Sequence, residues 1–320
     1  MVGFINENPS DFMFDITLNH LNLTYDLVTN KLLESHGYCQ DAVRCGNIVR
    51  DEVATGLAIL EEFKRNGYVD YVFYEDIFPF QGFFDFCRIS IHATRGEEYY
   101  VEGGYDALNS TFDKNGKFRM EIIINITCSN IYDIFRSARV VVAHEVLHAY
   151  EDYNRRLNGK QSLEAFYDNG YYGAAEEVYS ENNEPEKTLA YVIEFLSDVE
   201  RNAYISQTMS ELEDIKMCHA PKPDAFLTVL KQTESFNALM NVRRIVSDYV
   251  AMTKMKGRKE DKERIERYFN NICKGGRKIH RSFPSIVNLL VKKYNAFYRQ
   301  YITNVGKMYY DKLCFDRSFR

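Results

Sequence analysis

Two histidines four residues apart, with a glutamate beside the first, are the residues of this chain best suited to chemistry. They are His144, Glu145 and His148, in the order His-Glu-Val-Leu-His. Histidines at i and i+4 lie one turn apart on one face of a helix, so both rings can reach a single metal ion. Imidazole nitrogens suit zinc, which lowers the pKa of a bound water toward about 7. Glu145 would accept the proton of that water and later pass it to a leaving amine.

The sequence around this motif predicts a strand followed by a long helix. Residues 118–128 (FRMEIIINITC) form the clearest strand in the chain, and Asn115-Gly116 just before it is a strong turn signal. A helix is expected from about 131 to 157, with Ser129 or Asn130 as its N-cap. The motif therefore falls within a predicted helix directly after a predicted strand.

The residues before this strand predict a further helix and a small sheet. Residues 41–66 show apolar side chains at helical spacing, and Gly67 stands where a C-cap belongs. Residues 83–94 have the β-branched and aromatic composition of a strand, and residues 98–104 are predicted to pair with it. Gly103-Gly104, at the end of that second strand, is interpreted as a turn.

The C-terminal half predicts helices only. Residues 187–215 form one helix or two, because Ser197 and Glu200 have the spacing of a capping box that can begin a second helix. Residues 218–223 are the best linker candidate, and residues 224–320 are expected to be helical, with breaks at Gly275-Gly276 and Pro284.

The order of these elements indicates an α+β fold with an all-α C-terminal region. We accordingly predict two regions. Residues 1–217 would hold the sheet, the motif helix and the N-terminal helices, and residues 218–320 would form a basic helical region.

The strand, the helix and the segment HEVLHAYEDY together resemble the zincin-like metallopeptidases over roughly residues 40–215. The resemblance implies a small twisted sheet packed on the active-site helix, and an edge strand that holds extended peptide by backbone pairing. We expect residues 119–127 to be that edge strand. The implied activity is zinc-dependent hydrolysis of peptide bonds in a peptide or protein substrate, with His144 and His148 as zinc ligands and Glu145 as the base.

The resemblance also requires a third zinc ligand, and two glutamates compete for this role. Glu194 and Asp198 match the E-x-x-x-D pattern of thermolysin-like enzymes, in which the aspartate orients a ligand histidine. Glu200 and Ala203 match the E-x-x-A pattern of many short zincin-like proteins. On one continuous helix Glu194 and Glu200 would be about 600° apart, so both could not face the metal. We favour Glu200, because the Ser197 cap and Ala203 fit its geometry.

A peptidase of this kind also needs a donor for the developing oxyanion. Tyr204, one turn after Glu200, is the first choice, and Tyr150 and His219 are the alternatives.

The charge of the chain is unevenly distributed. Residues 251–320 contain 18 Lys and Arg against 6 Asp and Glu, although the whole chain has a formal net charge of −6. Such a basic segment is typical of a solvated helical surface that docks on an acidic body, or of a site for nucleic acid or another polyanion. The alternative function is thus a catalytically silent zincin-like module whose basic helical tail binds a protein partner or nucleic acid.

The composition excludes several other classes of protein. Hydrophobic residues make up 45% and charged residues 27% of the chain, which excludes a disordered protein. No apolar run is long enough for a membrane span, and the N-terminus shows no signal peptide. The 7 cysteines are scattered without a C-x-x-C pair, which favours free thiols over a cysteine zinc site. We expect a cytoplasmic or virion-associated protein, and the low-GC residue usage is compatible with a phage or bacterial source.

Overall fold

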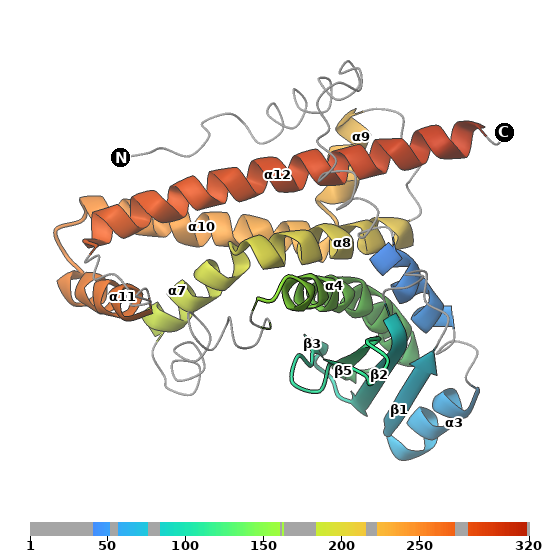
Figure 1. Cartoon of the computed structure of the whole chain (residues 1–320). Coiled ribbons are helices and arrows are strands. Elements are labelled where there is room, and N and C mark those ends of the chain that lie inside the picture. The colour runs from blue at the N-terminus through green and yellow to red at the C-terminus, as the bar shows by residue number, and fades with distance from the viewer. Residues whose placement is uncertain are drawn as a thin grey trace. The chain divides into compact units, whose positions relative to one another are not determined.

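The computed structural model describes residues 41–51, 57–75, 84–160, 162, 184–215, 223–272 and 281–318. It has a mixed α+β architecture, with a small sheet and many helices (Figure 1), which confirms the predicted class. The strands are β1 (Tyr68–Glu75), β2 (Phe84–Arg95), β3 (Tyr100–Tyr105), β4 (Thr111–Phe112) and β5 (Phe118–Cys128). The labelled helices are α3 (Leu57–Asn66), α4 (Ile131–Leu157), α7 (Glu184–Phe195), α8 (Asp198–Asp214), α9 (Pro223–Leu230), α10 (Glu234–Lys254), α11 (Lys259–Ile272) and α12 (Phe283–Ser318).

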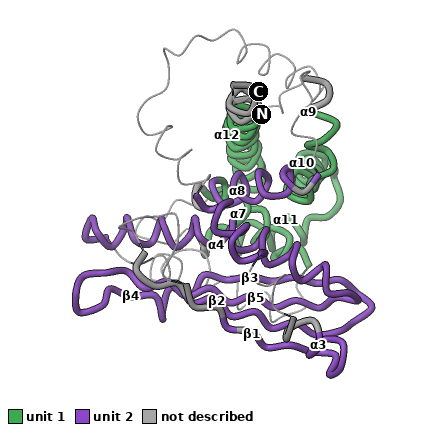
Figure 2. Tube along the Cα trace, turned by 90° about the vertical axis from the view of Figure 1, so that its right-hand side faces the viewer, with its two compact units in different colours: residues 1–24, 164–201, 217–320 green, residues 25–163, 202–216 purple. Residues whose placement is uncertain are grey.

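The chain divides into two compact units, which Figure 2 distinguishes by colour. The sheet unit comprises residues 25–163 and 202–216, and the helical unit comprises residues 1–24, 164–201 and 217–320. Residues 164–201 belong to the same unit as the C-terminal helices, and the domain division at 217/218 stays a prediction.

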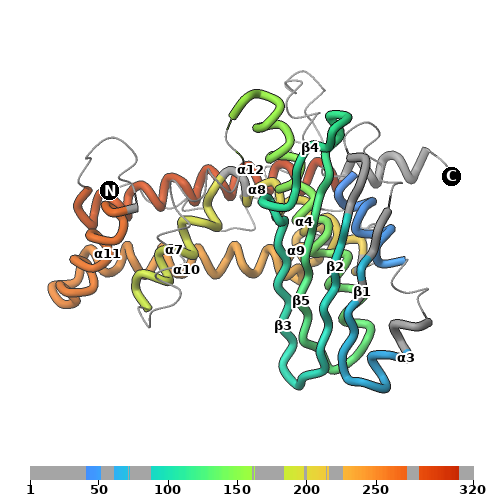
Figure 3. The backbone as a smooth tube through the Cα atoms, turned by 60° about the horizontal axis from the view of Figure 1, so that its bottom comes forward, coloured from blue at the N-terminus to red at the C-terminus, as the bar shows by residue number. Residues whose placement is uncertain are grey.

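The sheet has five strands of mixed direction, in the order β1-β2-β5-β3, with β4 also pairing with β5 (Figure 3). β2 and β5 are parallel, whereas β1 is antiparallel to β2 and β3 is antiparallel to β5. Two predictions are therefore wrong. The strand at 98–104 does not pair with β2 but with β5, and residues 119–127 are not an edge strand, because β5 has a neighbour on each side.

Strand β5 and helix α4 form the core of the sheet unit. Alternate residues of β5 from Phe118 to Cys128 are buried, whereas the intervening side chains are exposed or half-buried. This period of two places one face of β5 against α4, which also packs on β3. Helix α4 buries Ala138, Val142 and Ala143 completely. The buried residues of β5 thus mark the face that the motif helix covers.

Both ends of α4 agree with the prediction. Asn130 is the N-cap, and its side chain accepts hydrogen bonds from the backbone N–H groups of Tyr132 and Asp133. These contacts satisfy two of the donors that a helix leaves unpaired at its start. The turn at Gly116, which has φ 79°, leads from β4 into β5 as expected.

Upstream of the sheet, residues 41–51 and 57–66 are helical, and residues 52–56 of the predicted 41–66 helix lie outside the described part. Gly67 ends α3 with φ 76° and donates its N–H to the carbonyl of Phe63, as a C-cap glycine does. The strand β1 that follows was not predicted, although Tyr68–Glu75 is rich in Tyr, Val and Phe, which favour strands.

The predicted second helix within 187–215 is confirmed. α7 ends at Phe195 and α8 begins at Asp198, with the Ser197 hydroxyl accepting the Glu200 N–H at 3.1 Å. The angle of about 600° between Glu194 and Glu200 assumed one continuous helix. Because the helix is broken between them, that argument against a shared direction no longer applies.

The described part of the helical unit contains α7, residues 198–201 of α8, and α9–α12. α10 contacts α7 and α12, and α11 contacts the same two helices. Arg264 of α11 donates two hydrogen bonds to the carboxylate of Glu186 of α7. One of the basic residues of the C-terminal region thus contributes to helix packing. Pro284 lies in the first turn of α12, where a proline is tolerated. The predicted break at 275–276 lies outside the described residues, and so does the predicted linker 218–223 except for Pro223, which is the first residue of α9.

Among the helices that the structure describes, none is both long enough and apolar enough to cross a bilayer.

Candidate metal centre

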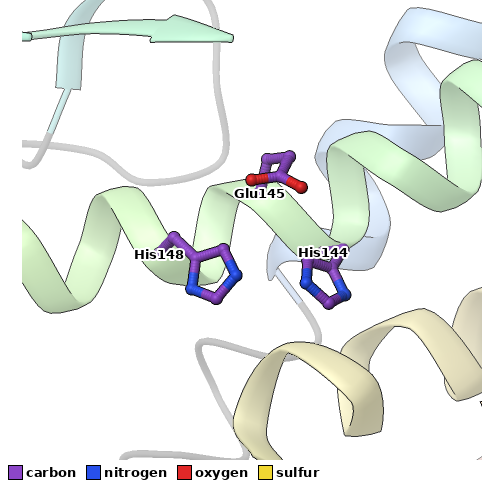
Figure 4. A group of neighbouring side chains, drawn as sticks. All are labelled: His144, Glu145 and His148. Carbon is purple, nitrogen blue, oxygen red and sulfur yellow. The ribbon is translucent and has the colours of Figure 1, made fainter. Parts of the chain in front are cut away.

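The two motif histidines lie side by side on α4. Figure 4 shows both rings on the same side of the helix, one turn apart, with Glu145 between them along its axis. The ring centroids of His144 and His148 are 4.9 Å apart, and the ring planes are inclined at 70°. Glu145 and His148 are buried, and His144 is half-buried. One ligand atom from each of the three residues lies within 4.8 Å of the others, so the group could hold a metal ion.

Glu145 faces the edge strand β3. Its Oε2 accepts the backbone N–H of Tyr105 at 2.8 Å. The backbone of β3 comes very near α4 here, because a Cβ added at Gly103 would lie 2.0 Å from Val141 Cγ1 and 3.4 Å from Glu145 Oε1. Gly103 and Gly104 are therefore strand residues of β3 and not the predicted turn. The glycine at 103 is needed for this close approach.

The side chain of Tyr105 fixes the same part of β3 to α4 a second time. Its hydroxyl donates to Asp152 Oδ2 at 2.8 Å, and Arg156 Nε donates to the same oxygen at 2.8 Å. Burial, and next to it the charge of Asp152, raises the pKa of the Tyr105 phenol above its ordinary value. The backbone and the side chain of this one tyrosine thus hold β3 against α4, through Glu145 and Asp152 respectively.

His144 is held by two side chains of α8. Its Nδ1 lies 3.0 Å from Gln207 Oε1, and Gln207 Nε2 donates to Glu211 Oε1 at 3.0 Å. The ring of Tyr204 packs edge-on against His144, with centroids 5.1 Å apart and planes at 86°. If Nδ1 carries the proton that the Gln207 oxygen accepts, Nε2 is left with a lone pair for a metal.

The position of α8 beside α4 depends on a buried arginine. Arg139 of α4 is 1% exposed, and it donates from Nε to the Ser210 hydroxyl at 3.0 Å and from its terminal nitrogen to the Ser210 carbonyl. Glu213 lies 3.6 Å from the same guanidinium and also accepts from Asn47 Nδ2 at 3.0 Å. A charge buried to this degree is tolerated only when it is paired and hydrogen-bonded.

The other predicted site residues are placed as follows. Tyr204 lies beside His144, as described, and Tyr150 is half-buried on α4. His219 falls outside the described residues. Glu194 and Glu200 belong to the helical unit, whereas the two histidines belong to the sheet unit. The identity of the third ligand and of the oxyanion donor stays a prediction.

Sequence reasoning missed Gln207, Glu211 and Tyr105, three residues that contact the motif directly or through one neighbour. Gln207 and Glu211 are four residues apart on α8, a spacing at which helical side chains meet. Nothing in the sequence indicates that this pair faces His144.

A scan against models of protein families, a search of curated proteins and a search of solved structures each find no match for this chain.

Proposed function

We propose that this protein is a zinc-dependent metallopeptidase of the zincin type. One observation carries the proposal: the ligand atoms of His144, Glu145 and His148 gather within 4.8 Å on one buried stretch of helix. A nearby edge strand, β3, contributes a backbone contact to the glutamate of the same group. A metal site beside a strand edge is the arrangement that a peptide hydrolase of this type needs.

The two imidazoles that lie together would suit zinc once a further carboxylate completes the set. Two imidazole nitrogens and a carboxylate form a ligand combination typical of catalytic zinc sites that keep one position open. In the proposal His144 and His148 bind the ion, and Glu200 supplies the third ligand, with Glu194 as the alternative. When bound, zinc supplies a Lewis acid that polarises a carbonyl oxygen and acidifies water.

The substrate in this proposal is an extended peptide that pairs with β3. Asp106 N–H bonds to Glu121 of β5, whereas Tyr105 N–H is taken by Glu145 on the other side. Backbone groups of alternate strand residues point to opposite sides. The N–H and C=O groups of Val101 and Gly103 therefore point away from β5, where a peptide could pair with them.

Glu145 would act as the proton carrier. Its Oε2 is fixed by the Tyr105 amide, so Oε1 is the oxygen that would take a proton from the attacking water. The water oxygen would bond to the peptide carbonyl carbon, and Glu145 would return the proton to the amide nitrogen as the C–N bond breaks. Tyr204, beside His144, is the proposed donor to the oxyanion.

The rival function is a zincin-like module without catalysis. The contact between Glu145 Oε2 and Tyr105 N–H favours it, because the glutamate already has a structural role in joining β3 to α4. In that case the basic C-terminal helices would bind a protein partner or nucleic acid, and the histidines would be structural.

The replacement of Glu145 by Gln separates the two functions. Glu145→Gln keeps the shape of the side chain but cannot accept the proton, so it should bind zinc like the wild type and lose hydrolysis of unfolded protein substrates. Glu98→Gln, at an exposed position, is the matched control and should change neither property. If purified zinc-loaded wild type cleaves no denatured protein or peptide library, the catalytic proposal is wrong and the rival stands.

A further inference from the structure

The contact between His144 and α8 extends beyond a single hydrogen bond. Gln207 lies between the His144 ring and Glu211, with both distances at 3.0 Å. We propose that Gln207, held by Glu211, is a positioning residue that fixes His144 in the tautomer with its proton on Nδ1 and so reserves Nε2 for a metal. The metal part of this inference rests on the proposed function, whereas the tautomer can be tested without metal.

The orientation of the Gln207 amide follows from the chemistry of its neighbour. Gln207 Nε2 donates to Glu211 Oε1 at 3.0 Å, and with Glu211 as the carboxylate, which only accepts hydrogen bonds, the NH2 group of Gln207 faces Glu211. The amide oxygen then faces His144, and because an amide oxygen cannot donate, the ring nitrogen must supply the proton. Nδ1 therefore carries hydrogen, and in the neutral ring Nε2 is the unprotonated nitrogen.

The surroundings hold this arrangement in place. Glu211 is 4% exposed, so its carboxylate has little water to exchange for the Gln207 amide. Tyr204 packs edge-on at 5.1 Å, and His148 lies at 4.9 Å from the His144 centroid. Rotation of the His144 ring would break the bond to Gln207 and displace these two rings. The ring is therefore positioned before any metal arrives.

The sharpest test exchanges the two polar groups. In Gln207→Leu the acceptor for Nδ1–H is lost. In Glu211→Gln the acceptor-only group is lost, so the Gln207 amide is free to present either end to His144. The double variant Gln207→Glu/Glu211→Gln restores both hydrogen bonds. The carboxylate introduced by Gln207→Glu can accept from His144 Nδ1 and from the amide introduced by Glu211→Gln. Gln300→Leu, on the exposed face of α12, is the matched control for the first change.

The first measurement is nitrogen-15 NMR of the histidine side chains in the metal-free full-length protein. We expect the wild type, the control and the double variant to show protonated Nδ1 at His144. Gln207→Leu should lose this preference, and Glu211→Gln should give a mixture. A wild-type signal with hydrogen on Nε2, or a Gln207→Leu spectrum equal to that of the wild type, overturns the inference.

The second measurement is zinc affinity by competition with a chelator. Loss of a residue that orients a ligand histidine typically weakens metal binding by about 10–100-fold. We expect a loss of this size in Gln207→Leu, and recovery of most of the wild-type affinity in the double variant. Equal affinities of wild type and Gln207→Leu overturn the positioning role. A wild type that keeps the Nδ1 proton but binds no zinc instead refutes the proposed function while the tautomer assignment holds.

Discussion

The close approach of β3 to α4 can be tested with one methyl group. Alanine at position 103 would place its Cβ 2.0 Å from Val141 Cγ1, whereas carbon atoms in contact lie about 3.5–4.0 Å apart. The strand must therefore retreat by roughly 1.5 Å, or Val141 must leave its rotamer. Such a retreat would stretch the 2.8 Å hydrogen bond between Tyr105 N–H and Glu145 beyond bonding distance.

The expected cost of Gly103→Ala follows from these two effects. Overpacking of this kind costs about 1–3 kcal/mol, and loss of a hydrogen bond to a charged group costs about 1.5–3 kcal/mol. The clash can be relieved by a shift of β3 or by a new rotamer of Val141, so the two costs do not add in full. We expect the free energy of unfolding to fall by roughly 3 kcal/mol in total. The measurement is the urea midpoint by circular dichroism, with hydrogen exchange of β3 peptides by mass spectrometry to localise the change.

The neighbouring glycine provides the control. A Cβ at Gly104 meets nothing within 4 Å, and neither glycine has a positive φ, so Gly104→Ala should alter stability by less than about 0.5 kcal/mol. The double variant Gly103→Ala/Val141→Ala removes the clashing methyl and should recover part of the loss. Equal urea midpoints and equal β3 exchange for Gly103→Ala and Gly104→Ala would refute the close approach.

Three further predictions follow from contacts elsewhere in the sheet unit. Asn130→Ala should lower the free energy of unfolding by about 1 kcal/mol in urea titrations, whereas Ser129→Ala should not, because only Asn130 caps α4. Gly46→Ala should lower the free energy of unfolding by about 1–3 kcal/mol, because its Cβ would lie 2.3 Å from the Arg139 carbonyl oxygen. Alanine has the better helix propensity, so a variant more stable than the wild type would contradict the clash. The raised pKa of Tyr105 keeps its phenol protonated in the folded state at a pH where the same phenol ionises in the unfolded chain. The urea midpoint should therefore fall as the pH rises above about 10. In Tyr105→Phe the urea midpoint should fall less over the same pH range.

The sequence predicts the elements that carry a strong local signal. β5 and α4 have the predicted bounds, because the turn signal before the strand and the N-cap before the helix lie in the residues next to these elements. The break before α8 is likewise local, since Ser197 and Glu200 are three residues apart. The α+β class follows from the order of such elements.

The pairing of the strands could not be predicted in the same way. β3 comes after β2 along the chain, yet it pairs with β5, which is decided by packing on α4 and not by neighbouring residues. Gly103 signals a turn when only its neighbours in sequence are considered, whereas its actual role depends on Val141, which lies on another element. The error about the edge strand has the same cause.

In the candidate site, too, some residues have a local sequence signal and others are brought in by tertiary packing. His144, Glu145 and His148 are recognisable from their spacing alone, because one helical turn brings them together. Gln207 meets His144 across 63 positions of sequence, and contacts between α8 and α4 bring it there, among them those of Arg139 with Ser210 and of Asn202 with Glu151. The ligands can thus be recognised from local spacing, whereas the residues that orient them can be recognised only from the tertiary structure.

The central claim is that His144 and His148 hold one metal ion, and metal analysis of purified protein tests it most directly. We expect about one zinc per chain in the wild type, because two imidazoles and a carboxylate suit this ion. His148→Ala should contain almost none, while His92→Ala, which removes an exposed histidine paired with Asp70, should keep the full amount. Zinc absent from the wild type after exposure to the ion, or equally present in His148→Ala, would contradict the account.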